Sequence, residues 1–498
     1  MTGRHSLEFF AATSGPARPG TAQPLMAEPT GLEPTSVVVI GGGIAGLVTA
    51  WEVARAGRAV TLFEATSSVG GCIARHRVAD LDLDAGAESF AIATRAVLDL
   101  IDDLGLSSRV VSPNPAGAWV RHARGSAPLP TDSLLGIPAH PLAGDVRRVL
   151  GPIGATRAAL DLLLPRRVGG TAATLGGMVT RRMGRTVVKR LVEPVAGGVY
   201  STDPDELELD SAQPALRAAV SRTGSLATAV RRLRATSARP GSAVAGLTGG
   251  LYTLVEALRA DLERLGGLVL TDTAVRAAAQ AADGWRVLVG DDQVGADDVV
   301  LAVPGADISR ILALVDVDVP PTAAVTNTVR LVTLVVEHPA LDAHPRGTGI
   351  LVSRHASGVA AKALTHATAK WAWLAQAAGP GRHVLRLSYG RGDDDLPSDL
   401  VGTALRDASV LLGVDLDRSH LIDSDVIGWT SALPRPQPGH RAAMATLKGQ
   451  IAQQPGLHLT GSMVDGTGLA AVITGARTAA TRLLSVTTQA DGPRPADR

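Results

Sequence analysis

The chain has 498 residues, with 48 Lys or Arg against 47 Asp or Glu, so its formal net charge is only +1. This balance excludes a general basic surface for nucleic acid. The single cysteine excludes a disulfide framework and a Cys-rich zinc site, and we expect no metal ion. Apolar residues make up 45% and charged residues 19%, which predicts a globular chain of about two to four domains.

The beginning of the chain carries no recognisable targeting signal. Residues 1–35 contain Pro, Gly, Ser and Thr without a period and lack the apolar run of a secretory signal, so we expect a disordered tail and a cytoplasmic protein. The run Val37–Trp51 is shorter than the ~20 residues that a spanning helix needs. The segment Leu134–Arg167 mixes Leu, Ile, Pro and Arg. It predicts ordinary helices of a globular domain, with a peripheral membrane contact as the alternative.

A nucleotide-binding pattern follows the tail. The apolar run Val37–Ile40 predicts a buried parallel strand, and the G-x-G-x-x-G motif Gly41–Gly46 comes directly after it. A helix through Arg55 and a second strand, Ala59–Phe63, follow, and Glu64 ends that strand. Such a turn binds a pyrophosphate at the helix N-terminus, and the acid binds a ribose. The complete unit makes an unrelated glycine turn the weaker alternative. The predicted binding residues here are Gly41, Gly42, Gly43, Ile44, Ala45, Gly46, Glu64 and Ala65.

Later segments favour FAD over NAD. Two glycines follow the acid after a short loop, a second glycine loop follows Asp84, and a late strand, Leu457–Thr460, leads through a glycine turn into a helix from Ala470 to Leu484. The dipole of that last helix would stabilise negative charge on a reduced flavin. We expect non-covalent FAD, with Cys72 as a small buried residue rather than a covalent anchor. The additional predicted cofactor residues are Gly70, Gly71, Gly86, Ala87, Glu88, Ser89, Gly461, Thr467, Gly468 and Leu469.

Motifs in the middle of the chain carry a more specific resemblance. Leu191–Tyr200, Leu364–Thr365 with Lys370–Trp371, and Trp429–His440 occur in this order. With the flavin motifs, they make about residues 36–485 resemble the flavin amine oxidase-like superfamily, and within it the protoporphyrinogen/coproporphyrinogen oxidases. Amine oxidases and carotenoid desaturases share the flavin motifs but not these central ones.

The resemblance implies the six-electron oxidation of coproporphyrinogen III to coproporphyrin III in haem biosynthesis, with O2 as the electron acceptor and H2O2 as its product. Flavin N5 would accept the hydride, so no side chain is predicted to be catalytic. The resemblance also implies that Val275 and Trp429 contact FAD, and that the enzyme transiently contacts the next enzyme of the pathway.

Three other functions stay open at this point. One is protoporphyrinogen IX oxidation, and another is an FAD amine oxidase or carotenoid desaturase. The third is a flavin-retaining partner of the haem pathway without turnover. Amine oxidases surround the flavin with aromatic residues, and this chain has only six Trp, three Tyr and four Phe.

The predicted fold class is α/β, with a discontinuous Rossmann-type FAD-binding domain, an α+β substrate-binding domain and a helical lobe. Alternation of apolar and polar residues at Val329–Val336 and His383–Tyr389 predicts antiparallel strands in the substrate-binding domain. The predicted division is 36–95, 245–310 and 430–485 for FAD, 96–240 for the lobe, 311–428 for the substrate, and 486–498 for a disordered tail.

Cationic residues are the candidates for binding the substrate's propionates, because Arg and Lys pair with carboxylates. Met178, Leu191 and Leu364 are the candidates for the apolar wall of the pocket. We expect structural roles for His366, His440 and Asp465. Glu88 stands where some family members carry Arg, so propionate contacts do not transfer simply. The cationic candidates are Arg95, Lys189, Arg190, Lys362 and Lys370.

Overall fold

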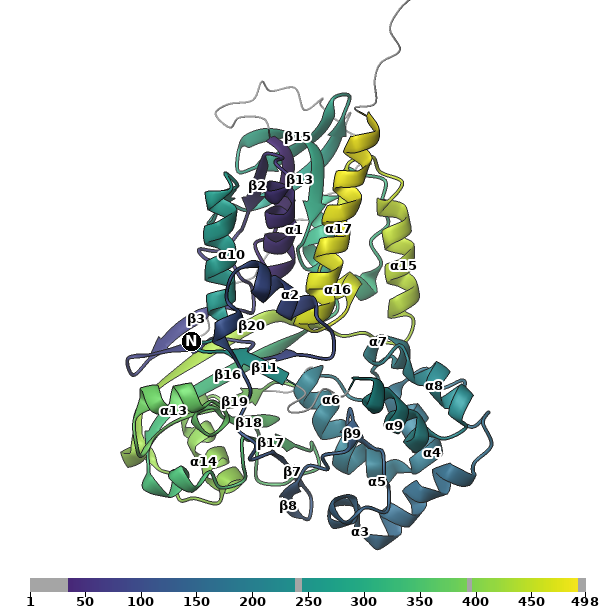
Figure 1. The fold of residues 1–498 in the computed structure, drawn as a ribbon, viewed down its shortest axis with the longest axis vertical. Coiled ribbons are helices and arrows are strands. Elements are labelled where there is room, and N and C mark those ends of the chain that lie inside the picture. Colours follow the sequence, from purple (N-terminus) through teal and green to yellow (C-terminus); the bar gives the residue numbers. More distant parts are fainter. Residues whose placement is uncertain (1–34, 238–243, 392–395, 491–498) are drawn as a thin grey trace, which may run out of the picture.

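A seven-stranded sheet forms the upper part of the molecule in the computed structural model, which describes residues 35–237, 244–391 and 396–490 (Figure 1). Five of its strands are parallel, and a β-hairpin continues it antiparallel. The parallel strands are β12 (Leu268–Leu270), β2 (Val60–Phe63), β1 (Thr35–Ile40), β15 (Asp292–Leu301) and β21 (Leu457–Leu459). The hairpin consists of β13 (Val275–Ala281) and β14 (Gly284–Val289).

Helices cover both faces of this sheet, as expected for parallel strands that are apolar throughout. Val37 and Val39 of β1 point into one core, which contains α1 (Ile44–Arg55), α10 (Tyr252–Arg264) and α17 (Leu469–Ala490). Val38 and Ile40 point into the opposite core, with α11 (Gly305–Ile311) and α15 (His440–Ile451). The sequence therefore alternates between two buried sides, which explains its unbroken apolar character.

A second seven-stranded sheet lies below the first, in the order β20-β16-β19-β18-β17-β7-β8. The expected antiparallel strands are confirmed: β16 pairs with β19 from Arg330 opposite Tyr389 to Glu337 opposite Arg382. Helix α14 (Leu400–Leu412) packs against one face of the sheet. The strands are β20 (Leu421–Pro434), β16 (Thr326–Glu337), β19 (Arg382–Tyr389), β18 (Ala363–His366), β17 (Gly349–Val352), β7 (Ala118–His122) and β8 (Gly125–Pro128).

The helical lobe is shorter than the expected 96–240. Strands β7 and β8 leave it and join the second sheet, where β7 runs parallel to β17. Strand β17, the distant partner of β7, is more than two hundred residues further along the chain, so local periodicity could not identify this pairing. The lobe itself includes α3 (Gly144–Ala159), α4 (Leu175–Met183), α6 (Glu193–Val199), α8 (Leu216–Thr223) and α9 (Leu226–Ser237).

Two further expected boundaries differ from the structure. Strand β20 extends to Pro434, so the start of the segment expected at 430–485 belongs to the second sheet. Helix α17 continues to Ala490, beyond the expected end at 485, because no Gly or Pro lies between residue 485 and Gly492. Residues 1–34 and 491–498, which make up most of the two expected tails, lie outside the described residues.

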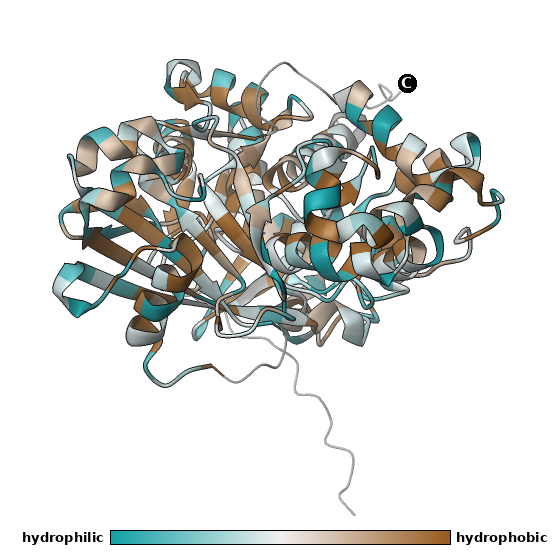
Figure 2. Cartoon of the chain, turned by 90° about the horizontal axis from the view of Figure 1, so that it is seen from below, coloured by the Kyte–Doolittle hydropathy of each residue, from teal (hydrophilic) through white to brown (hydrophobic). Residues whose placement is uncertain are grey.

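Hydrophobic residues concentrate on the strands and on the inward sides of the helices (Figure 2). In the described ranges, no helix is both long enough and apolar enough to cross a bilayer.

Candidate cofactor and active site

The glycine turn between β1 and α1 is held tightly by the protein itself. Gly41 has a φ of +103°, and a Cβ there would lie 2.6 Å from the carbonyl oxygen of Ala302. A Cβ on Gly46 would lie 1.9 Å from the carbonyl oxygen of Gly41. Both positions therefore need glycine for the fold alone, because neither backbone atom can move away cheaply.

Gly43 is different, because a Cβ at this position would meet no protein atom within 4 Å. Its φ of −64° is open to any residue, so the fold does not require glycine here. Gly43 is the N-cap of α1, which has no side-chain cap and no acidic residue in its first turn. An open space in front of uncapped helix amides fits a pyrophosphate, so these residues are compatible with a dinucleotide cofactor.

Glu64 lies beside this turn and holds it in place. Its Oε2 accepts a hydrogen bond of 2.7 Å from the backbone nitrogen of Gly42. Its Oε1 accepts from the backbone nitrogen of Thr66 at 2.8 Å and from the Thr66 hydroxyl at 2.7 Å. The structure thus places the acid beside the glycine turn and gives it a bracing role that the sequence did not indicate. Ala65 is exposed next to it.

Backbone hydrogen bonds connect the loops at residues 70–72 and 86–89, both predicted to bind the cofactor, to the glycine turn and to each other. The backbone nitrogen of Gly70 donates to the carbonyl oxygen of Gly42 at 2.7 Å, and that of Ala87 donates to the carbonyl oxygen of Cys72 at 3.0 Å. A Cβ on Gly86 would lie 2.1 Å from the same Cys72 oxygen, so close packing against residue 72 requires this glycine. Cys72 itself is exposed, and the expectation of a buried residue is wrong.

The second sheet holds the loop of residues 85–89. Trp429 of β20 donates from Nε1 to the carbonyl oxygen of Ala85 at 3.2 Å. Arg386 of β19 donates to the carbonyl oxygen of Gly86 at 2.5 Å and to Glu88 at 2.8 Å. Lys370, at the end of α12 (Ala367–Lys370), lies 2.6 Å from Glu88. Sequence reasoning missed Arg386, because a polar residue fits the alternating pattern of β19 and its partners lie 298 and 300 residues away in the chain.

Burial and two cations act in opposite directions on Glu88. Burial alone would raise the pKa of its carboxyl group, but Lys370 and Arg386 more than offset this, so the pKa lies below its ordinary range. Glu88 is therefore an ionised group at neutral pH.

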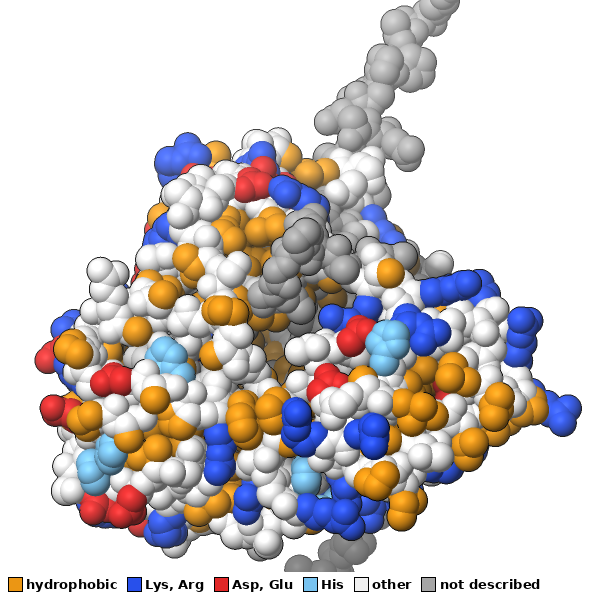
Figure 3. Space-filling model, turned by 60° about the horizontal axis from the view of Figure 1, so that its bottom comes forward, with side chains coloured by type: hydrophobic (Ala, Val, Ile, Leu, Met, Phe, Trp, Pro, Cys, Tyr) orange, Lys and Arg blue, Asp and Glu red, His pale blue; other side chains and the backbone are white. Residues whose placement is uncertain are grey.

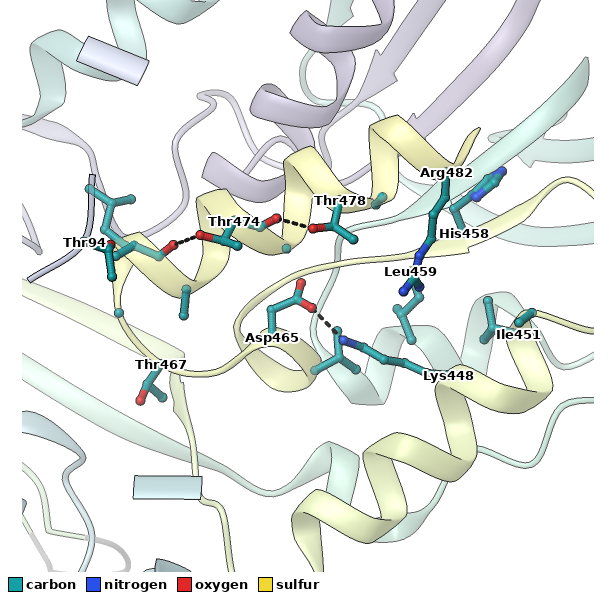
Figure 4. A pocket seen from close by; sticks show the side chains of 18 of the residues that line it. Thr94, Lys448, Ile451, His458, Leu459, Asp465, Thr467, Thr474, Thr478 and Arg482 are labelled. Atoms are coloured by element: carbon teal, nitrogen blue, oxygen red, sulfur yellow. Dashed lines mark hydrogen bonds and ion pairs between the residues drawn. The ribbon is translucent and has the colours of Figure 1, made fainter. Parts of the chain in front are cut away.

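Asp465 braces the late segment that is predicted to bind the cofactor. Asp465 accepts hydrogen bonds from the Thr460 hydroxyl at 2.8 Å and the Gly461 nitrogen at 2.9 Å, and its other oxygen lies 2.7 Å from Lys448 (Figure 4). These bonds fix the turn that leads into α17. A groove of about 1240 Å³ is lined by Ser89, at the end of the 85–89 loop, and by Thr467, Gly468 and Leu469, so the end of this loop and the late segment face the same space, whereas the glycine turn does not line it. Val275 lies apart from this groove, buried in β13.

The five cationic candidates for the substrate lie in different settings. Arg95 is exposed and pairs with Asp99 and Asp102 of its own surface helix. Lys370 is engaged by Glu88, as described above. Lys189 is exposed, whereas Lys362 is buried at 2% exposure and donates to Ser201 Oγ at 2.6 Å. Arg190 donates to the carbonyl oxygens of Val149 and Leu150. Lys189 and Lys362 stay predictions for propionate binding.

The apolar and titratable candidates have structural surroundings. Met178 and Leu191 are fully buried in the core of the helical lobe, and Leu364 is buried in the core of the second sheet, so these three do not form one pocket wall. His366 is fully buried beside His383, at 3.1 Å between ring nitrogens. Burial, with smaller effects from His383 and His344, lowers the pKa of His366 to about 3.

His440 is buried, with Nε2 3.0 Å from the carbonyl oxygen of Met463. Among the residues that the structure describes, no group of His, Cys, Asp and Glu side chains could hold a metal ion.

Known proteins resemble this chain over nearly its whole length. The family model for flavin containing amine oxidoreductases matches residues 44–484. A coproporphyrinogen III oxidase of Mycobacterium tuberculosis is 31% identical over 472 residues, which cover 90% of this chain and 97% of that protein. A protoporphyrinogen oxidase of Bos taurus is 29% identical over 328 residues, or 60% of this chain and 66% of that protein.

A solved structure also resembles this chain over nearly its whole length. It belongs to a candidate protoporphyrinogen oxidase of Exiguobacterium sp. 255-15, which is 26% identical, with a TM-score of 0.78, and the match covers 92% of this chain and 100% of that one. The residues matched by the family model begin within the glycine turn, at residue 44, and include the 85–89 loop and the start of α17. The chain belongs to the flavin containing amine oxidoreductase family, and its relatives in that family include the coproporphyrinogen III oxidases.

Proposed function

We propose that the protein oxidises coproporphyrinogen III to coproporphyrin III with non-covalently bound FAD, using O2 as the electron acceptor. The observation that carries this proposal is the open space at Gly43, where the fold needs no glycine and a phosphate-bearing cofactor does. Similarity to a coproporphyrinogen III oxidase over 90% of the chain supports the choice of substrate.

The chain's own residues would bind the cofactor and the substrate and orient them. When bound, FAD supplies the hydride acceptor, since cofactors carry such chemistry. The amides at the start of α1 would hold the pyrophosphate, and Glu64 would keep their turn in position while it binds the ribose. The hydrogen bonds from Trp429 and Arg386 hold the 85–89 loop in place. Cations at the pocket would pair with the propionates of the substrate.

Two alternative substrates have weaker support. The protoporphyrinogen oxidase of Bos taurus matches only 60% of this chain. Amine oxidation would need aromatic walls around the flavin, and this chain has only six Trp, three Tyr and four Phe in all.

Anaerobic mixing of the purified yellow protein with coproporphyrinogen III, and separately with protoporphyrinogen IX, tests this function. We expect the flavin absorbance to bleach faster with coproporphyrinogen III and to return on admission of air. Acid denaturation should release all of the flavin. A flavin that no porphyrinogen bleaches would contradict the proposed activity, and flavin retained on the denatured chain would contradict non-covalent binding.

A surface of the helical lobe favours the peripheral membrane contact. Leu142, Ile153 and Leu163, on and next to α3, are 58%, 87% and 81% exposed. Figure 3 shows such hydrophobic side chains interspersed with Lys and Arg on this lobe. Exposed apolar residues with neighbouring cations fit an anionic bilayer. We expect sedimentation with anionic but not neutral vesicles, and loss of sedimentation in the variant Ile153→Ser/Leu163→Ser. The contact with the next enzyme and the cytoplasmic location stay predictions.

A further inference from the structure

Three ionisable side chains from three separate segments meet beside the 85–89 loop. Glu88 lies 2.6 Å from Lys370 and 2.8 Å from Arg386, and the three side chains are only 13%, 16% and 9% exposed. We call them the Glu88 cluster. Because they are largely removed from water, each charge acts over a longer range than a surface charge would.

Asp84 completes the charge balance of this region. It ends β4 (Leu81–Asp84), directly before the loop, and its carboxylate accepts hydrogen bonds from the backbone nitrogens of Leu251 and Tyr252 at 3.0 and 2.9 Å. Arg386 also acts electrostatically on this carboxylate, so the region contains two acids and two bases. Removal of any one charge therefore leaves an imbalance of one unit, whose sign depends on the residue removed.

The loop that carries Glu88 is connected to the other predicted cofactor segments. Gly43 forms a β-bridge with Gly70, Ala87 donates a backbone hydrogen bond to Cys72, and Ser89 lines the same groove as Thr467. Positive charge near a flavin stabilises the negative charge that reduction brings, and a carboxylate opposes it.

We propose that Lys370 and Arg386 are positioning residues that hold the 86–89 loop toward the flavin, and that the charges of the Glu88 cluster set the flavin's reduction potential. This inference rests on the proposed function, because it requires flavin in this site. It assigns to Lys370 a role toward the cofactor in place of the predicted propionate contact.

The test is a midpoint-potential titration of the purified flavin-loaded protein, with sulfite affinity measured by flavin absorbance as a second readout. We expect Lys370→Met and Arg386→Gln to lower the potential and weaken sulfite binding. Glu88→Gln should do the opposite. We expect about a tenfold change in the equilibrium constant for two-electron reduction, which is about 30 mV.

Two controls separate charge from structure. Lys370→Arg keeps the charge and should keep the original potential. Arg259→Gln removes an exposed cation that pairs with Glu263 on α10, and it should change nothing. Shifts of one sign in all cluster variants, or no shift in any, would overturn the inference, since loosening the loop cannot produce opposite signs. If Arg386→Gln or Glu88→Gln loses flavin, the difference in midpoint potential between Lys370→Met and Lys370→Arg tests the inference, because these two variants differ in charge at the same position. Failure of the proposed function would appear earlier, as a wild-type protein without bleachable flavin.

Discussion

The Oε2 atom of Glu64 lies 2.7 Å from the backbone nitrogen of Gly42, so the acid that ends the second strand braces the glycine turn after the first. A Cβ on Gly42 would lie 3.0 Å from the Cβ of Glu64, so the glycine permits this contact. Within this fold, the acid of the dinucleotide motif has a structural partner before any ribose arrives. Loss of its carboxylate should therefore affect both the turn and the cofactor.

We expect Glu64→Ala to weaken FAD binding by about 10- to 100-fold, because charge-assisted hydrogen bonds contribute about 1.5–3 kcal/mol. The protein without flavin should also melt at a lower temperature, because the Gly42 amide loses its acceptor. Flavin titration and thermal melting measure the two effects. Thr66→Val is the matched control, because it removes one donor to Oε1 and leaves the Gly42 bond intact. An unchanged flavin titration in Glu64→Ala would contradict the assignment.

The glycines of the turn should separate cofactor binding from stability. Gly43→Val should abolish flavin binding, because the side chain fills the space intended for the phosphates, yet the flavin-free protein should lose only about 1 kcal/mol of stability, the usual effect of a poorer N-cap residue. Gly46→Ala should lower the free energy of unfolding by about 1–3 kcal/mol, because its Cβ would lie 1.9 Å from a backbone oxygen. Urea denaturation and flavin absorbance measure both. A Gly43→Val protein that purifies yellow would show that the phosphate site lies elsewhere.

The sequence predicted those features that depend on neighbouring residues. The unbroken apolar run of β1, the glycine turn and the alternation of β16 and β19 each follow from local periodicity. Contacts between distant segments left no local signal. The pairing of β7 with β17 and the ties from Arg386 and Trp429 to the 85–89 loop join residues that are hundreds of positions apart.

The same limit affected the charged residues. Arg95 was an attractive propionate ligand in the sequence, but helical spacing brings it to Asp99, and the fold leaves it on the surface. Glu88 looked like a departure from a cationic pattern. Its partners come from other segments, so their charges could not be assigned to the loop from sequence order alone.

Asp84 should make stability depend on pH. Burial raises the pKa of its carboxyl group to about 6, although two backbone donors partly offset this. The folded-state pKa is above the unfolded value, so the favourable contribution is complete below about pH 4 and disappears as the pH rises through 6. The stability of the wild type relative to Asp84→Asn should fall by about 2–3 kcal/mol between pH 4 and pH 7. Urea denaturation at several pH values measures this difference, and a difference independent of pH would contradict it.

The last prediction concerns the choice between two porphyrinogens. Coproporphyrinogen III carries four propionates, and protoporphyrinogen IX carries two propionates and two vinyl groups. A site with cations for four carboxylates leaves two of them unpaired with the second substrate, and each lost charge-assisted bond costs about 1.5–3 kcal/mol. We therefore expect kcat/KM to favour coproporphyrinogen III by about 100-fold or more. Added salt should weaken coproporphyrinogen binding more, if the cations lie near the mouth of the pocket, because exposed charges are screened. Steady-state kinetics with both substrates at low and high salt measure these effects. Equal kcat/KM at low salt would favour an apolar site supplied from a membrane, for which the exposed Leu142, Ile153 and Leu163 of the helical lobe would be the point of contact.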